Sequence, residues 1–401
     1  MKGVFRIVRS VLIWAVVVLI GVEVLSFVAI TVSNLVLYGR AREGSGAVYD
    51  PYSLFLMAEG VRPTTNNSVS YDVDKNRIIW LFGGSTMRGS TDSPDKTIAS
   101  FLAAFLNSRQ RDLDFTVINY GMKSFNSLLE VQYLQKLLIE SQEPPDLIVF
   151  YDGANDVKYL VEHQTPYGHY GYRRAKALIE SYDRSWFGLL KPLNAAIYSS
   201  FTKELFDKIH QVFVPIKHDS KLVREMARTV EERYDHAEKM ARAYGAEFLV
   251  VWQPMRWVER CGISEEVKSK EKGLPLSPQD FTALQNNFSI PYMAIAERLK
   301  KKPYFVDFQN IFCGRKVPMY KPDGVHLLDE GRESVARQMG RIIVKRFFSG
   351  TPNAGPDSNE ESAHDGRGDN HETGLPNHVD AMCGRTDAGR GISTRGSTVF
   401  P

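Results

Sequence analysis

Residues 77–84 read "RIIWLFGG", a short run of β-branched and aromatic residues that stops at two glycines. Such a run is typical of a buried strand that ends in a tight turn. Amphipathic helical patterns cover residues 97–107, 128–140, 222–244, 281–300 and 329–347. Between them lie four more strand-like runs: "FTVINYG" (115–121), "DLIVFYDG" (146–153), "EFLVVWQP" (247–254) and "YFVDFQN" (304–310). This alternation predicts an α/β fold with a parallel sheet covered by helices on both faces.

The carboxyl ends of parallel strands collect the reactive groups of such folds. The first strand leads into Ser85, although a serine after two glycines is by itself more typical of a plain turn. The second strand ends at Gly121, whose N–H no side chain shields. The third leads into Gly153, Asn155 and Asp156. Here the Asn155 amide can donate to a developing oxyanion while Asp156 supports the loop, or the two residues can simply form an Asx turn.

Asp323 and His326 lie just before the last helical pattern. Their spacing lets the carboxylate accept a hydrogen bond from one imidazole nitrogen while the other nitrogen faces outward. A histidine held in this way can take the proton of a serine hydroxyl, which a neutral hydroxyl needs in order to attack an acyl carbon. Without the serine, the pair would be interpreted as an Asp–His contact that stabilises the start of the last helix. Together with Ser85, it predicts acyl chemistry.

Four blocks, "FGGST", "INYGM", "DGAND" and "DGVH", occur in an order that resembles the SGNH hydrolase superfamily of GDSL-type esterases and acyl-transfer enzymes. The resemblance covers residues 76–348. It implies a three-layer α/β/α sandwich around a five-stranded parallel sheet, the flavodoxin-like SGNH fold. It also implies a reaction that uses no metal and no cofactor.

The resemblance also assigns roles to residues of these blocks. Ser85 would be the nucleophile, His326 the general base and Asp323 the partner that orients the base. The N–H groups of Ser85 and Gly121 would form the oxyanion hole with Asn155.

The chain departs from the family pattern at two positions. Gly84 stands where the family usually has an aspartate, and Ser124 stands where the second block often has a further glycine. Because the base, its partner and the oxyanion donors all remain, we expect activity to survive with an altered packing of the pocket. Gly84, Gly153 and Asp156 are expected to support the site loops.

The N-terminus carries the most biased segment of the chain. Residues 11–38 are almost wholly apolar and long enough to cross a membrane as one helix. Three cations in residues 1–10 predict a cytoplasmic N-terminus and an extracytoplasmic domain, in a bacterial inner membrane. Cleavage as a signal peptide near "SFVA" stays open. Glu23, inside the apolar segment, is expected either to face a partner helix or to be protonated in a lone helix.

The remaining segments complete the domain organisation. Residues 39–75 are interpreted as a linker and domain entry, and 76–348 as the hydrolase domain. Within that domain, residues 158–219 form an insertion that either walls a pocket or is a surface addition. Residues 349–401 are rich in Gly, Pro, Asp and Asn, which predicts a disordered tail. Cys261 and Cys313 can pair in an oxidising compartment, while Cys383 lies in the tail.

Composition excludes some classes of function. The chain of 401 residues has a formal net charge of +3 and contains no zinc-finger spacing, phosphate loop or GxGxxG motif, so we expect no nucleic-acid partner. The sequence predicts a membrane-anchored serine esterase or deacylase. Its expected substrates are O-acyl esters, foremost O-acetyl esters, of a cell-surface glycan or lipid. The alternatives are an O-acyltransferase that uses the same residues, and a non-catalytic membrane-tethered binding protein.

Overall fold

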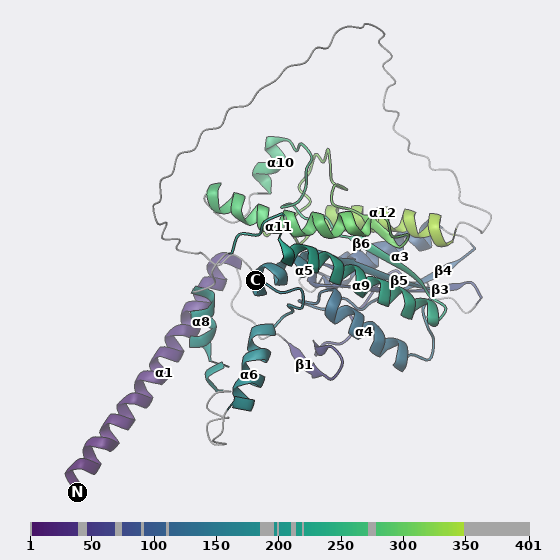
Figure 1. Cartoon of the computed structure of the whole chain (residues 1–401). Helices are drawn as coiled ribbons and strands as arrows, with labels where there is room; N and C mark the ends of the chain where they lie inside the picture. Colours follow the sequence, from purple (N-terminus) through teal and green to yellow (C-terminus); the bar gives the residue numbers. More distant parts are fainter. Residues whose placement is uncertain are drawn as a thin grey trace.

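The computed structural model describes most of the chain as ordered elements (Figure 1). The described residues are 2–38, 46–68, 74–89, 92–109, 112–184, 196–198, 200–209, 214–218, 220–271 and 278–348. The expected tail at 349–401 and parts of the expected linker and insertion lie outside these ranges.

A parallel sheet of five strands forms the centre of the domain, as the sequence predicts. The strands lie in the order β4-β3-β5-β6-β7. Their bounds are β3 Asn76–Gly83, β4 Asp114–Asn119, β5 Leu147–Asp152, β6 Glu247–Trp252 and β7 Phe305–Asp307. The chain moves from β3 to one neighbour and then crosses to the other, so β3 and β5 meet at the point where the strand order reverses. In open α/β sheets this point is where ligands bind.

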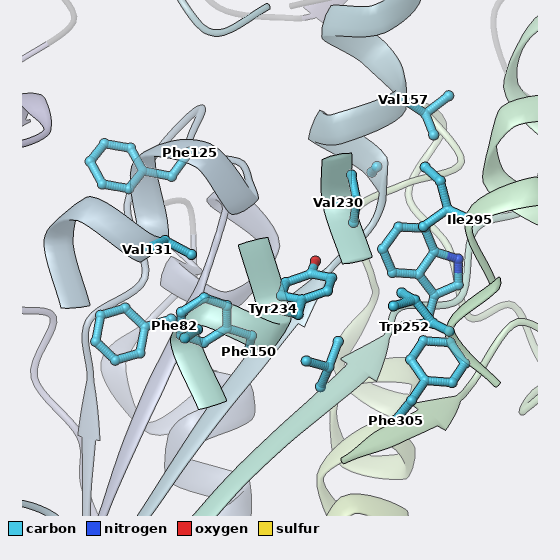
Figure 2. Close-up of a cluster of buried hydrophobic side chains, with 14 of the residues drawn as sticks. Phe82, Phe125, Val131, Phe150, Val157, Val230, Tyr234, Trp252, Ile295 and Phe305 are labelled. Carbon is cyan, nitrogen blue, oxygen red and sulfur yellow. The ribbon is translucent and has the colours of Figure 1, made fainter. Parts of the chain in front are cut away.

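Helices cover both faces of the sheet, because successive side chains of each strand point to opposite faces (Figure 1). Ile79 and Leu81 of β3 pack under α3 (Ile98–Arg109) and α12 (Asp329–Phe347). Trp80 and Phe82 point to the other face, under α4 (Ser127–Glu140), α9 (Lys221–Ala243) and α11 (Pro278–Leu299). Figure 2 shows this second core, in which Phe150 lies between Phe82 and Tyr234. This is the expected three-layer sandwich.

Shorter elements lie at the edges of the domain. The helices are α2 (Ser85–Arg88), the 3-10 turn η1 (Pro94–Lys96), α5 (Ala154–His163), α6 (Tyr172–Arg184), α8 (Phe201–Ile209) and α10 (Glu265–Lys270). Cys261 and Cys313 form a disulfide with a Cα–Cα distance of 5.4 Å, which confirms that these two residues pair.

The segment interpreted as a linker contains an unpredicted hairpin, β1 (Ala47–Asp50) and β2 (Leu54–Met57). It packs on the domain. Asp50 forms an ion pair with Lys136 of α4, and the Phe55 ring lies 5.2 Å from the Phe125 ring. Strands of four residues give too little alternation to be recognised by pattern, and their stability comes from this packing.

The first helix, α1, runs from Lys2 to Tyr38 and projects from the sandwich (Figure 1). Within it, residues 3–33 are long and apolar enough to cross a membrane. Most of its apolar side chains are exposed.

Candidate active site

Ser85, His326 and Asp323 form a hydrogen-bonded chain at the carboxyl end of the sheet. Ser85 begins α2 directly after β3, and its Oγ lies 2.8 Å from His326 Nε2. His326 Nδ1 lies 2.7 Å from Asp323 Oδ2. In the tautomer that carries a proton on Nδ1, this proton is donated to Asp323, and Nε2 is left to accept the proton of the serine hydroxyl.

The turn between Asp323 and His326 is fixed from two sides. Asp323 Oδ1 accepts hydrogen bonds from the N–H groups of Val325 and His326, at 2.9 and 2.8 Å. The buried Trp257 indole donates to the Asp323 carbonyl at 3.0 Å and packs on Gly324, whose φ of 71° favours glycine. No local pattern in the sequence predicts the role of Trp257.

The pKa of Asp323 is lowered. Burial acts to raise it, but the hydrogen bond and charge of His326, together with the two backbone N–H groups, outweigh burial. Asp323 therefore stays ionised and ready to hold the imidazole through the neutral range of pH.

Asn155 lies in the first turn of α5, beside the serine. Its Nδ2 donates to the Phe125 carbonyl at 2.6 Å, which leaves the second amide proton for another acceptor. Asp156 accepts from the N–H and hydroxyl of Ser127, at 3.2 and 2.5 Å, and lies 3.6 Å from the Arg233 guanidinium. These contacts join α5, α4 and α9, which is the supporting role expected of Asp156.

Gly153 precedes this turn with a φ of 133°, and a Cβ there would lie 2.6 Å from the Tyr292 hydroxyl. Glycine is therefore required both by the backbone conformation and by the space. This fits the supporting role expected of Gly153.

The structure explains why glycine occupies position 84. A Cβ on Gly84 would lie 2.4 Å from Asn155 Nδ2 and 3.2 Å from the Phe125 carbonyl oxygen. The backbone of Gly84, with a φ of −76°, suits any residue, so the constraint is space alone. In this chain an aspartate at position 84 would displace the Asn155 amide.

Gly121 does not offer a free N–H to the site. Its N–H donates to the buried Asn119 side chain at 3.0 Å, and the residue packs against the Arg88 backbone. The expectation that Gly121 is an oxyanion donor is therefore not supported by this geometry. Asn119 is two residues away in the sequence, and only the fold shows that its side chain turns toward this N–H.

Ser124 is the better candidate for that donor. It has a φ of 64°, the left-handed conformation that glycine adopts most easily. Its carbonyl accepts from the Tyr159 hydroxyl at 3.0 Å, and within the described part of the chain its N–H has no hydrogen-bond partner. The signal in the sequence was the family glycine usually found at this position.

Arg88 is a further residue that supports the site. Its side chain is fully buried, donates to the carbonyls of Gly60 and Gly121 at 3.0 and 3.2 Å, and pairs with Glu59. It lies one helical turn after Ser85, so it ties α2 to the loop after β4 and to the segment after the N-terminal hairpin. No local pattern predicts this contact.

A group of buried acids lies behind the site. Burial and the charge of Asp156 raise the pKa of Asp152 to about 7, and burial raises that of Glu130 well above its usual range. The carboxyl groups of Asp152 and Glu130 are close neighbours in the core, and Asp152 also accepts from the Tyr234 hydroxyl at 2.9 Å. A shared proton explains how both are accommodated in the core. In the described residues no group of three His, Cys, Asp or Glu is arranged to hold a metal ion.

The sheet with its Ser-His-Asp chain defines a serine hydrolase with an α/β sandwich. The chain belongs to the GDSL-like lipase/acylhydrolase family, whose model matches residues 79–339.

Solved structures similar to the chain were also found. Est24, a carbohydrate acetylesterase from Sinorhizobium meliloti, is 15% identical with a TM-score of 0.38 and covers 67% of this chain and 99% of its own. Axe2, an acetylxylan esterase from Geobacillus stearothermophilus, is 15% identical with a TM-score of 0.35 and covers 67% and 94%. An extracellular lipase from Streptomyces rimosus is 14% identical with a TM-score of 0.35 and covers 65% and 97%. No curated sequence matches the chain.

Proposed function

We propose that the protein is a membrane-anchored serine esterase that removes O-acyl groups through an acyl-enzyme at Ser85. The observation that carries the proposal is the continuous chain from the Ser85 hydroxyl through His326 to Asp323, with the Asn155 amide beside it.

The reaction follows from this geometry. His326 Nε2 takes the hydroxyl proton as Ser85 Oγ bonds to the ester carbon, and the charge of the imidazolium is balanced by Asp323. The resulting oxyanion is held by the Asn155 amide and by the N–H groups of Ser85 and Ser124. His326 then protonates the alcohol as the carbon–oxygen bond breaks. Water, deprotonated by His326, attacks the acyl-enzyme, and the acid and free Ser85 are released.

The proposed location is the outer side of the cytoplasmic membrane. α1 is long and apolar enough to span, and Lys2, Arg6 and Arg9 precede its apolar part. The pair Cys261–Cys313 supports an oxidising compartment for the domain. A protein held there meets O-acylated glycans and lipids of the cell surface, and O-acetyl esters of these are the proposed substrates.

Labelling of the full-length protein by a fluorophosphonate tests the proposal. We expect wild type to label and Ser85→Ala to remain unlabelled, because the reagent reacts only with an activated serine. If wild type failed to label while a related esterase labelled under the same conditions, the proposed enzymatic function would be excluded. The alternative, a non-catalytic binding protein, would then be favoured.

Product analysis then separates hydrolysis from transfer. An esterase releases acetate from an acetyl donor, and the rate of release stays the same when an oligosaccharide acceptor is added. Acetate release that falls while acetylated oligosaccharide accumulates would show an O-acyltransferase instead.

A further inference from the structure

We propose that the insertion within the hydrolase domain is a second membrane-contacting element, whose helix α8 packs on α1 at the depth of the outer leaflet. The partner is the lipid bilayer. The inference goes beyond the proposed esterase activity and rests on the proposed anchoring by α1.

The first observation is a polar contact on an apolar helix. The two carboxyl oxygens of Glu23 accept hydrogen bonds from the N–H groups of Phe201 and Thr202, at 2.5 and 3.0 Å, and from the Thr202 hydroxyl at 2.7 Å. These groups are the first N–H groups of α8, which have no partner inside their own helix. Of the two expectations for Glu23, the structure shows the first: Glu23 faces a partner helix, and this helix is α8 of the same chain.

The contact continues along both helices. The Ser26 and Thr202 hydroxyls lie 3.3 Å apart, and the rings of Phe27 and Phe201 lie 5.0 Å apart. Ile30, one turn further along α1, is buried, while most other apolar side chains of that helix are exposed. Figure 1 shows α8 lying along α1, outside the layers of the sandwich. α1 and α8 therefore form a specific helix–helix interface, of which the Glu23 contact is one part.

The position of Glu23 along α1 places this interface within the bilayer. Glu23 follows Arg9, the last cation before the apolar run, by 14 residues. At about 1.5 Å per residue this is a rise of about 21 Å in a hydrocarbon core of about 30 Å. With Arg9 at the inner boundary, Glu23 lies about 9 Å inside the outer boundary. An unpaired carboxyl group is costly at such a depth, and α8 removes the cost by donating to both oxygens.

The second observation is the distribution of exposed apolar side chains. Outside α1, the residues 158–219 hold an unusual share of them: Tyr167, Tyr170, Ile179, Ile197, Phe206 and Val214. α6 also exposes the cations Arg174 and Lys176, five and three residues before Ile179, and Lys176 forms an ion pair with Glu180 of the same helix. Apolar side chains beside basic ones are the pattern of a helix that lies in the interface of an anionic membrane. Figure 1 shows α6 extending in the same direction as α8, away from the sheet.

Site-directed spin labelling of the full-length chain in vesicles of phosphatidylcholine and phosphatidylglycerol tests the inference. In a Cys383→Ser background, labels are placed at Ile197→Cys and Ile179→Cys. Val17→Cys in α1 reports on anchoring. Ile139→Cys, at a residue 55% exposed at the end of α4, serves as the matched water-exposed control for Ile197, which is 49% exposed. Collision with oxygen, which concentrates in lipid, is compared with collision with a water-soluble nickel chelate.

We expect the labels at Ile197 and Val17 to favour oxygen several-fold over the ratio found at Ile139, with Ile179 between these values. A label at Ile197 that behaves like the one at Ile139 while Val17 reports lipid would overturn the inference and leave the anchoring intact. A label at Val17 that also reports water would overturn both.

Variants at Glu23 test the contact itself. In Glu23→Leu, α1 becomes more apolar but can no longer accept from α8, so the label at Ile197 should move into water while Val17 stays in lipid. Glu23→Gln, which keeps one acceptor oxygen, should show a smaller change. Hydrolysis of a soluble ester should be unchanged in both variants, which serves as the control for folding. An unchanged signal at Ile197 in Glu23→Leu would refute the role assigned to Glu23.

Discussion

Replacing Gly84 by alanine adds one methyl group at the most crowded point of the site. The new Cβ would lie 2.4 Å from Asn155 Nδ2, whereas ordinary contacts begin at 3.4 Å. Asn155 is held by its hydrogen bond to the Phe125 carbonyl, so its amide must break this bond or move by about 1 Å, a displacement that can cost about 10²-fold in rate. The backbone conformation at Gly84 suits alanine, and the other close contact of the new Cβ, 3.2 Å to the Phe125 carbonyl oxygen, is milder.

The effect should appear in kcat. An oxyanion donor acts in the transition state, and removal of one such donor costs about 10²–10³-fold in kcat, or about 3–4 kcal/mol. We expect Gly84→Ala to lower kcat for p-nitrophenyl acetate by about 10²-fold, with KM changed little. Gly84→Asp, which restores the residue usual in the family, should be at least as damaging. Gly262→Ala is the matched control, because nothing lies within 4 Å of its added Cβ.

A double-mutant cycle isolates the mechanism. In an Asn155→Ala background the clashing amide is absent, so Gly84→Ala should have little further effect on kcat. Wild-type kcat in Gly84→Ala, or equal losses in the two backgrounds, would refute the claim that Gly84 makes room for Asn155.

Three further predictions concern the base, the buried acids and the disulfide. Asp323→Asn should lower kcat by about 10⁴-fold at an unchanged fold by circular dichroism, because the imidazole loses the partner that sets its tautomer; a loss below tenfold would contradict this. The pKa of Asp152, raised to about 7, makes its contribution to stability fall as pH rises from about 4 to about 7. In Glu130→Gln the amide can donate to an ionised Asp152, so no shared proton is needed and Tm should fall less between pH 5 and 7 than in wild type. Identical profiles of Tm against pH in the variant and in wild type would argue against the shared proton. Replacing Cys261 and Cys313 by serine should lower the free energy of unfolding by up to about 4 kcal/mol, since the bridge closes a loop of 52 residues; an unchanged denaturant midpoint would contradict it.

The order and type of the main elements could be predicted from the sequence. The runs at 77–84 and 146–153 correspond to β3 (76–83) and β5 (147–152) within one residue at each end, because a strand buried on both faces must be continuously apolar. β7 is shorter than its apolar run at 304–310, since only Phe305–Asp307 pair with β6. Such a boundary depends on the neighbouring strand and leaves no local signal.

The four residues Ser85, Asn155, Asp323 and His326 could be grouped from the sequence, because each follows a strand or precedes the last helix, and parallel strands end at one edge. Which N–H groups face the reacting atoms could not be predicted in the same way. Gly121 satisfies the local pattern, but its N–H donates a hydrogen bond to the Asn119 side chain.

The sequence by itself determined the sheet, the residues gathered at its edge and an apolar helix of spanning length, since these follow from periodicity and from side-chain chemistry along short segments. The tertiary structure alone decided which groups satisfy one another. It placed Asn155 in the space that Gly84 leaves, Arg88 on the Gly121 carbonyl, and Glu23 on the N-terminus of a helix 178 residues later. Hydrogen bonds and close contacts join residues that are distant in the chain, and their geometry is fixed only when the whole core packs.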